Sequence, residues 1–474
     1  MTAGRRRAAL LACVLAGAGV RGARLLEAPF LHADSPALLR IARDEIGAGH
    51  WRAALAGYYP PLYPAAVRAA HTLGLEWDTA GRAVSYTAGV ATVALAGGLG
   101  TAILGDGAGI GAAALAAVHP GLVHASAEVL AESLYAALVG LWALLVLPGA
   151  APATVRLALG GFVGAVAALA RAEGIALVPL AALAGAWGAA SGARLRRALV
   201  PLAAAALVAL PVVLAVRLDT GTWAVSGKEA PVVLRKYGVA AGGIAALLVH
   251  HPGAFLAVYP RALARQIEYD LGATHWVLVV PLALGLAASV PATRRARGLV
   301  LATLAVFTLG IPILAPGKRY VVPLVPLLLP WVTPGLARLA AAARAGGLPA
   351  AARYGVAGAV VAGLLAQDLW PPQRDEEACY RDVCAFVATR SSTPPPAILA
   401  DDGRIAWVCG TRFALRPRGA DKAALGAAAR AAAAGLVIVP AGTPAGDASG
   451  LVRLGTRCSG PLALDVLAIA PTGP

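Results

Sequence analysis

Long apolar runs separated by short polar stretches make up most of the chain before residue 371. The runs are rich in Ala, Leu, Gly and Val and lack the period-two alternation of half-buried strands, so they predict helices. A helix of about twenty residues crosses a hydrocarbon core about 30 Å thick. We therefore expect about eleven membrane-spanning helices, at residues 8–26, 82–104, 108–123, 126–147, 157–171, 174–190, 198–216, 273–290, 297–314, 319–336 and 353–370.

The pattern changes after Trp370-Pro371-Pro372, where charged residues return. Apolar runs of strand length, at residues 397–400 and 435–439, flank an Ala-rich helical stretch at residues 422–434. This alternation predicts a small α/β domain. The expected organisation is a helical membrane domain at residues 1–370, including a polar outer loop with amphipathic helices at residues 27–81, and a soluble domain at residues 371–474.

The composition agrees with a membrane protein. Hydrophobic residues make up 59% of the chain and charged residues only 14%, against about 25% charged in soluble proteins. The formal charge of +16, from 40 Lys and Arg against 24 Asp and Glu, raises the question of a nucleic acid partner. The basic residues gather mainly in short loops between apolar runs, however, so membrane topology accounts for them and we expect no nucleic acid partner.

The arginine-rich loops also predict an orientation. With Arg5–Arg7 in the cytoplasm, Arg156 and the arginine clusters at residues 194–197, 294–297 and 338–353 fall on the same side, as the positive-inside rule requires. No small-residue cleavage site is evident before residue 27, so the first apolar run is expected to be a retained helix. We therefore predict a multi-pass protein of the inner (plasma) membrane, with a cytoplasmic N-terminus and its C-terminal domain outside.

Four of the five cysteines, Cys379, Cys384, Cys409 and Cys458, lie in the predicted C-terminal domain. Outside the cytoplasm they are expected to form one or two disulfides, with three possible pairings. A zinc site is the alternative, but the region after residue 371 contains no Cys-x-x-Cys motif and no histidine. Disulfides are therefore favoured over a metal.

Asp34 follows the first expected helix by about eight residues. A carboxylate near the membrane surface suits the role of a general base that takes a proton from a hydroxyl group. Asp34 or Ser35 before Pro36 is also a helix start signal, and spacing alone favours this capping role.

A second group of candidates consists of aromatic and acidic side chains. Tyr63, in the run Tyr58–Pro64, is interpreted equally well as a headgroup anchor or as a substrate contact. His124, Glu128 and Glu132 are spaced four apart and would lie on one face of the fourth helix. Such a face could bind a metal ion. Alternatively, Glu128 lies in the first turn of the helix, where the helix dipole stabilises a negative charge. Glu132 lies further inside the span, where an acid is costly and usually faces a cavity.

Cationic candidates lie in two further motifs. Arg171 and Glu173 interrupt an apolar run, which suggests either a structural ion pair or a phosphate contact. Lys318 and Arg319 precede Tyr320 on the expected outer side, where topology does not explain two cations. These two cations could bind lipid headgroups or a phosphate leaving group. We favour the phosphate, because the cations would neutralise the charge that develops on it.

The order of these motifs resembles that of GT-C-type, polyprenyl-phosphate-dependent glycosyltransferases. The shared features are an acid after the first helix, a Pro-Pro-x-Tyr-Pro element, an Arg-x-Glu element after the fifth helix and an Arg-Tyr-x-x-x-x-x-Pro pattern opening a late helix. The pattern is glycosyltransferase family 39-like. Two groups are the most similar: the protein O-mannosyltransferases and the lipid A aminoarabinose transferases. The former tend to carry a second acid after the first, and Ser35 stands there in this chain, which leaves the acceptor type open.

The resemblance implies a GT-C-like α-helical polytopic membrane protein that transfers a sugar, with inversion, from a polyprenyl-phosphate donor. The acceptor would be a lipid, glycan or protein hydroxyl on the outer side of the membrane. Asp34 would be the general base, and the donor-phosphate ligands would be Lys318, Arg319 and Arg171. Substrate-positioning roles would fall to Tyr63, Tyr320, Glu128 and Glu132. No metal ligand is assigned, although some enzymes of this type use a divalent cation.

A multi-pass transporter or flippase of lipid-linked sugars is the alternative. Such a protein should show pseudo-symmetric halves and polar residues near the midplane of several helices. In this chain the polar residues lie instead at the outer ends of the expected helices and in one long loop, which favours chemistry at the membrane surface. The chain also contains no Walker loop, no G-x-S-x-G elbow and no H-E-x-x-H motif.

Overall fold

The computed structural model describes residues 2–27, 31–149, 152–187, 189–221, 223–240, 243–288, 290–346, 355, 358, 360, 362–364, 374–390, 397–416, 422–441, 451–458 and 462–469. The chain divides into two compact units. Met1–Glu27 and Leu39–Trp370 form the first, called the helical unit below, and Ala28–Leu38 and Pro371–Pro474 form the second, called the C-terminal unit. The short segment that carries Asp34 therefore groups with the C-terminal unit.

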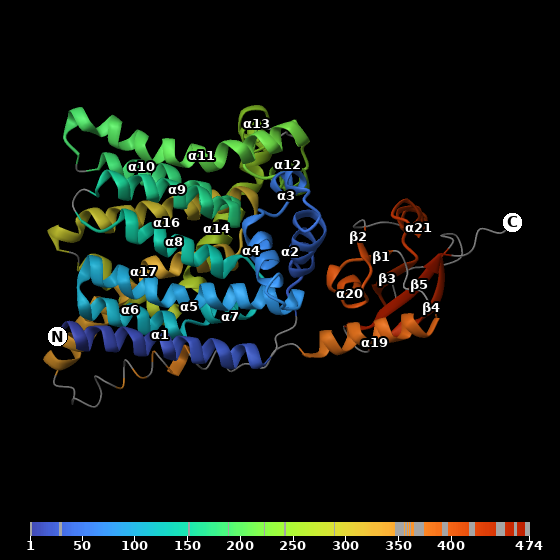
Figure 1. The fold of residues 1–474 in the computed structure, drawn as a ribbon, viewed down its shortest axis with the longest axis horizontal. Coiled ribbons are helices and arrows are strands. Elements are labelled where there is room, and N and C mark those ends of the chain that lie inside the picture. The colour runs from blue at the N-terminus through green and yellow to red at the C-terminus, as the bar shows by residue number, and fades with distance from the viewer. Residues whose placement is uncertain are drawn as a thin grey trace. The chain divides into compact units, whose positions relative to one another are not determined.

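The helical unit is a bundle in which most of the long helices run side by side (Figure 1). The helices up to residue 345 are α1 (Ala3–Leu26), α2 (Ser35–Arg40), α3 (Trp51–Ala56), α4 (Leu62–His71), α5 (Trp77–Leu104), α6 (Asp106–Val118), α7 (Pro120–Ala127), α8 (Glu132–Val146), α9 (Thr154–Ala170), α10 (Leu177–Ala186), α11 (Arg194–Thr220), α12 (Glu229–Tyr237), α13 (Ile244–His250), α14 (Pro252–Thr274), α15 (Trp276–Ala287), α16 (Arg294–Leu314) and α17 (Val325–Ala345). Short π and 3-10 segments connect them: η1 (Ile41–Ile46), η2 (Ala172–Ala176), η3 (Ser191–Ala193), η4 (Pro291–Thr293), η5 (Lys318–Tyr320) and η6 (Val322–Leu324).

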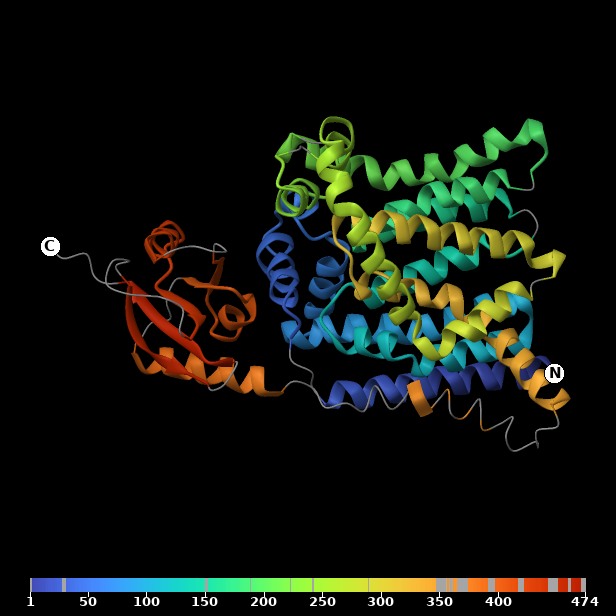
Figure 2. The ribbon, with the colours of Figure 1, turned by 180° about the vertical axis from the view of Figure 1, so that it is seen from behind.

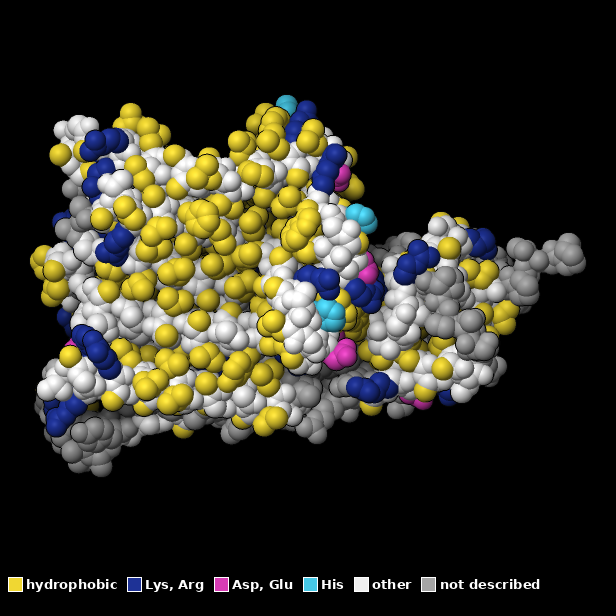
Figure 3. All heavy atoms as spheres, viewed as in Figure 1, with side chains coloured by type: hydrophobic (Ala, Val, Ile, Leu, Met, Phe, Trp, Pro, Cys, Tyr) yellow, Lys and Arg dark blue, Asp and Glu magenta, His cyan; other side chains and the backbone are white. Residues whose placement is uncertain are grey.

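The bundle has the properties of a membrane-spanning domain. Among the described residues, five helices are long and apolar enough to cross a membrane, or up to seven if each of two bent pairs counts as one span. A broad apolar surface covers the bundle, with Lys and Arg side chains near its ends (Figure 3). Glycines allow close helix contact, as at Gly335, where an added Cβ would lie 1.7 Å from the Pro281 carbonyl oxygen of α15.

The predicted helical architecture is confirmed. A helix or helix pair overlaps each of the first ten predicted spans, whereas the eleventh, residues 353–370, lies largely outside the described residues. The predicted span 273–290 contains α15, which meets α14 at an angle of 91°. Figure 2 shows α14 crossing the bundle obliquely instead of running along it.

The third and fourth predicted spans, residues 108–123 and 126–147, are interrupted in the structure. The helical path bends by 54° between α6 and α7 at His119, and α7 ends at Ala127, several residues before α8 begins at Glu132. The buried guanidinium of Arg21 binds the carbonyl oxygens of Ala116 and Ala117, which lie at the end of α6, at 2.9 and 3.0 Å. An arginine from α1 thus satisfies acceptors that the break leaves without helical partners.

The C-terminal unit contains a five-stranded mixed sheet in the order β2-β1-β3-β5-β4. Its elements are α19 (Arg374–Arg390), β1 (Ala397–Ala400), α20 (Gly403–Val408), β2 (Arg412–Leu415), α21 (Lys422–Ala431), β3 (Leu436–Pro440), β4 (Leu451–Arg457) and β5 (Leu464–Ile469). Strand β1 pairs in parallel with β2 and β3, and β5 pairs antiparallel with β3 and β4. Apolar residues of α19 and α20 pack on one face of the sheet and those of α21 on the other. The predicted α/β character is therefore confirmed.

Two disulfides stabilise this unit, as the sequence predicted. Cys379 pairs with Cys458, linking α19 to the end of β4, and Cys384 pairs with Cys409, linking α19 to the end of α20. Of the three possible pairings, the structure selects this one. The bonded cysteines lie 79 and 25 residues apart in the sequence, so the two bridges close long loops of the unfolded chain.

Candidate functional site

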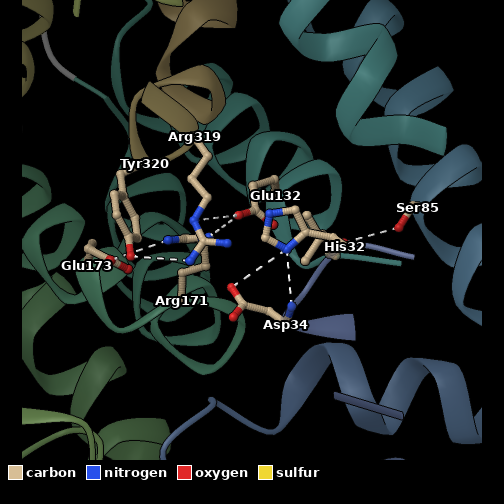
Figure 4. Close-up of polar contacts among 9 residues, drawn as sticks. His32, Asp34, Ser85, Glu132, Arg171, Glu173, Arg319 and Tyr320 are labelled. Atoms are coloured by element: carbon tan, nitrogen blue, oxygen red, sulfur yellow. Dashed lines mark hydrogen bonds and ion pairs between the residues drawn. The ribbon is translucent and has the colours of Figure 1, made fainter. Parts of the chain in front are cut away.

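The segment that carries Asp34 lies just before α2. The Asp34 carbonyl oxygen accepts hydrogen bonds from the backbone N–H groups of Ala37 and Leu38, so this residue occupies the start of the helix, as the capping interpretation predicted. Its carboxylate is partly exposed and lies 3.9 Å from Nδ1 of His32, which also accepts the Asp34 N–H at 3.2 Å. His32 has no motif to mark it in the sequence. The pair is drawn in Figure 4.

A cluster of charged side chains lies within the helical unit, where several helix ends converge. Nη1 of Arg171 donates to Oε1 of Glu132 at 2.5 Å, and Nη2 lies 3.4 Å from Oε1 of Glu173. Nε of Arg319 lies 4.0 Å from the same oxygen of Glu132. Figure 4 shows the two guanidinium groups pointing toward Glu132. Five residues (Glu132, Arg171, Glu173, Arg319 and Tyr320) form this group, called the charged cluster below.

The ring of Tyr320 is the centre of the cationic side of this cluster. Charged groups of Arg171, Arg319 and Lys228 lie 4.6, 5.3 and 5.2 Å from the centre of the ring, and Nη2 of Arg319 donates to the Tyr320 hydroxyl at 3.5 Å. Such distances are typical of cation–π contacts. Three cations therefore surround this ring, next to the two carboxylates that bind Arg171.

Helix ends account for the convergence. Glu132 is the first residue of α8, where the helix dipole favours a negative charge. Arg171 lies between α9 and η2, and Arg319 lies in η5 before α17. The side chains of Glu132 and Arg171 are 4% and 10% exposed, whereas that of Arg319 is 37% exposed. The buried ion pair is therefore the fixed part of the cluster, and Arg319 is the part that an anion can reach.

A cavity of about 230 Å³ adjoins the cluster. Its polar lining includes Glu173, Lys228 and Glu229, and its apolar lining comes from η2 and from the second half of α16. Burial raises the pKa of Glu229, although the Ile244 backbone, which hydrogen-bonds to its carboxylate, partly opposes that effect. The cavity therefore combines apolar walls with a few polar groups, as small-molecule sites do, and its charged lining is two carboxylates and one lysine.

Two predictions differ from the structure: the role of Tyr63, and the shared helix face of His124, Glu128 and Glu132. Tyr63 is completely buried, and its hydroxyl donates to the Gly81 carbonyl oxygen at 2.9 Å and lies 3.0 Å from Oγ of Ser85. Neither the headgroup anchor nor the substrate contact describes this ring in the structure. The motif that contains Tyr63 instead holds α4 against α5, because a buried hydroxyl needs hydrogen-bond partners.

The prediction that His124, Glu128 and Glu132 share one helix face is also wrong. His124 lies in α7, Glu128 follows its last residue in an extended conformation, and Glu132 begins α8. Within the described residues, no group of three or more His, Cys, Asp or Glu side chains is arranged to hold a metal ion. The described residues therefore do not fit a divalent cation site.

The remaining predicted residues fall in or beside the charged cluster. Arg171, Glu132, Arg319 and Tyr320 belong to it, while Lys318, the neighbour of Arg319 in η5, is exposed. Lys228 directly precedes α12, and no motif in the sequence marks it as a site residue. Its contact with Tyr320 joins residues 92 positions apart, which no local pattern could have indicated.

The sequence matches no protein-family model and no curated protein. Among solved structures, the chain is similar to ArnT from Cupriavidus metallidurans bound to undecaprenyl phosphate, with a TM-score of 0.61, 14% identity and 100% of both chains covered. It is also similar to the oligosaccharyltransferase of Archaeoglobus fulgidus in the apo form, with a TM-score of 0.58, 12% identity, and 92% of this chain and 69% of that chain covered. The archaeal enzyme AglB, in complex with an inhibitory peptide and a dolichol-phosphate, gives a TM-score of 0.55 at 12% identity, with 91% of this chain and 69% of that chain covered. The chain therefore has the GT-C fold of these membrane glycosyltransferases.

Proposed function

We propose that the protein is an integral membrane glycosyltransferase that takes a sugar from a polyprenyl-phosphate donor and transfers it to a hydroxyl group of a lipid, glycan or protein. The observation that carries this proposal is the charged cluster, with Lys228 against its Tyr320 ring, beside a largely apolar cavity in a chain with the GT-C fold. Structures of two similar proteins contain undecaprenyl phosphate and dolichol-phosphate, which are ligands of this chemical class.

The donor phosphate would bind to the accessible cations. Arg319 is more exposed than its neighbours in the cluster, Lys318 adjoins it on the surface, and Lys228 lines the cavity. Arg171 is committed to two carboxylates, so its contribution to phosphate binding would be its charge and its contact with the Tyr320 ring. Cations fixed in place before reaction stabilise negative charge that develops on a leaving phosphate.

The reaction would be a single displacement. The acceptor oxygen attacks the anomeric carbon, the bond from that carbon to the phosphate oxygen breaks, and polyprenyl phosphate leaves with the electron pair. Asp34 would take the acceptor proton as general base, and the anomeric configuration would invert. His32, which contacts Asp34 within the C-terminal unit, would orient that carboxylate. The donor and acceptor would react on the outer side of the membrane.

The test separates donor binding from transfer. Purified full-length protein is assayed for binding of labelled undecaprenyl phosphate and for sugar release from a panel of labelled polyprenyl-phosphate sugars. Arg319→Gln should weaken binding about 10- to 150-fold, because hydrogen bonds to charged groups contribute about 1.5–3 kcal/mol. Asp34→Asn should retain binding and lose transfer.

Arg217 provides a matched control. It is an exposed arginine in the last turn of α11 that contacts the Trp223 ring, and it belongs to neither the cluster nor the cavity. Arg217→Gln should bind undecaprenyl phosphate as the wild type does. If the Arg319→Gln variant bound undecaprenyl phosphate as tightly as the wild type, the assigned phosphate site would be refuted. A transporter or flippase, the alternative function, would release no sugar in detergent, and Asp34→Asn would change nothing there.

A further inference from the structure

A second pocket lies at the opposite end of α16 from the charged cluster. Helix α16 runs for 21 residues from Arg294 to Leu314, a length of about 30 Å, so its two ends lie about one hydrocarbon thickness apart. The pocket has a volume of about 450 Å³ and opens between the ends of α10 and α15 and the start of α16. Its lining includes Trp187, Leu286, Arg294, Arg297, Gly298 and Leu301.

The two arginines of this pocket bring positive charge that no described carboxylate neutralises. The Arg294 side chain is exposed and forms no hydrogen bond or ion pair with any residue that the structure describes. Arg297 is half-buried and donates one N–H to the Leu286 carbonyl oxygen at 3.2 Å. Arginine in the first turn of a helix opposes the helix dipole, so helix stability does not explain these residues.

The neighbouring Arg295 shows what a structural arginine at this end looks like. Its guanidinium is buried and donates to the carbonyl oxygens of Val146, Leu147, Gly149 and Ala184 at 2.9–3.2 Å. Arg294 and Arg297 make no such set of bonds in the described structure. The positive-inside trend accounts for charge on this side of the membrane, but it does not account for two arginines on the wall of one pocket.

The apolar part of the pocket comes from an indole ring and two helices. The Trp187 ring lies so close to α16 that a Cβ at Gly298 would meet it at 2.6 Å, so the glycine lets the ring pack against the helix backbone. Trp187 and Leu301 nevertheless remain 39% and 45% exposed. The pocket thus has a pair of guanidinium groups next to apolar walls. The guanidinium groups match a phosphate headgroup, and the apolar walls match the acyl chain joined to it.

We propose that this pocket binds an anionic glycerophospholipid of the leaflet on the arginine-rich side of the bundle. The guanidinium groups of Arg294 and Arg297 contact its phosphate, and an acyl chain lies against Trp187 and Leu301. Guanidinium groups match phosphate geometry, and basic pockets between membrane helices bind anionic headgroups. Free inorganic phosphate would leave the apolar walls unused, so we assign the site to a lipid. This site is independent of the glycosyl transfer proposed above.

The experiment compares lipids of equal chain length and different charge. Detergent-purified full-length protein is incubated with phosphatidylglycerol or phosphatidylcholine, and the bound lipid is counted by native mass spectrometry. The wild type should retain phosphatidylglycerol in preference. Arg294→Gln should reduce that retention about fivefold, and the double variant Arg294→Gln/Arg297→Gln should reduce it further by a similar factor. Retention of phosphatidylcholine should change little in both.

Arg196→Gln is the matched control, because Arg196 is exposed near the start of α11, among the arginines assigned to the same side, and does not line the pocket. It should retain phosphatidylglycerol as the wild type does. Arg294 makes no described contact that folding requires, so the single variant tests the site even if Arg297→Gln impairs folding. The proposal is overturned if the wild type retains both lipids equally, if Arg196→Gln loses as much lipid as Arg294→Gln, or if millimolar inorganic phosphate displaces the lipid.

Discussion

Gln266 offers the sharpest test of how the cationic turn is held. This side chain of α14 is completely buried, and its Oε1 accepts the backbone N–H of Gly317 at 3.1 Å. Gly317 immediately precedes Lys318 and Arg319, so the bond fixes the start of the turn that carries both cations. The amide nitrogen of Gln266 donates to Asp270 at 2.7 Å, and Asp270 accepts a second bond from the Thr308 hydroxyl at 2.5 Å.

Gln266→Leu removes the acceptor of the Gly317 N–H and one donor to Asp270, while the side chain keeps a similar size. A buried group left without its partner costs about 1–3 kcal/mol. If that free energy is lost from the ordered turn, the KM for the polyprenyl-phosphate donor should rise by about 5- to 150-fold, because each 1.4 kcal/mol corresponds to a factor of ten. The unfolding temperature should fall as well.

Thr308→Val separates the effect on the turn from the effect on stability. This variant also removes one hydrogen bond from Asp270, but it leaves the bond between Gln266 and Gly317 in place. Both variants should therefore unfold at a lower temperature, and only Gln266→Leu should weaken donor binding, measured with labelled undecaprenyl phosphate. An unchanged donor affinity in Gln266→Leu, or an equal loss of affinity in both variants, would refute the assignment of Gln266 as a positioning residue.

Three further changes test other parts of the structure. Arg295→Met leaves four carbonyl oxygens without their donor and should lower the free energy of unfolding by about 2–4 kcal/mol, measured by thermal denaturation, with undecaprenyl phosphate binding unchanged. Burial lowers the pKa of Lys236 to about 8, so between pH 8 and pH 10 the unfolded chain binds more protons than the folded one. The unfolding temperature should therefore rise with pH over that window, and Lys236→Met should flatten the rise. Arg404, which Asp402 binds, donates to the carbonyl oxygen of Leu31, three residues before Asp34, at 3.4 Å. Because this bond helps to position the Asp34 segment, Arg404→Met should lower kcat several-fold. Equal kcat values for the variant and the wild type would contradict this role.

Local patterns predicted most of the secondary structure. The strands at residues 397–400 and 436–440 and the helix that begins at Lys422 lie where short apolar runs and Ala-rich sequence placed them. In these cases the preference of each short segment agrees with the fold, so periodicity suffices. The disulfides were expected as a class, but their pairing depends on how α19 packs, which sequence does not contain.

The break between α7 and α8 shows where periodicity fails. Apolar residues continue on both sides of it, so the sequence suggests an uninterrupted face that carries His124, Glu128 and Glu132. The path is set instead by contacts from other helices, such as those of Arg21 with the end of α6 and of Arg82 with the Ala127 carbonyl oxygen at 3.0 Å. A pattern within one segment cannot reveal partners that come from another.

The same limit applies to charged residues, because their partners also come from other segments. Those partners, once known, distinguish structural from functional charges. An ionisable residue inside an apolar segment is a functional candidate by default, yet Arg295 binds four main-chain carbonyl oxygens at helix ends and is a structural residue. Arg171 has two carboxylate partners, and the carboxylate of Glu132 also draws the more exposed Arg319 toward it. Carbonyl oxygens at the ends of helices need donors in any bundle, so an arginine that binds them has a sufficient structural reason. Buried carboxylates that collect several arginines do not, because replacing such a pair by apolar side chains is often neutral or stabilising. Glu132 and its arginines therefore lack such a structural reason, and we expect their charge to serve the transfer reaction. Glu132→Gln, which removes that charge, should lose transfer and should also unfold at a lower temperature, because removing one partner of a buried ion pair costs about 3–5 kcal/mol.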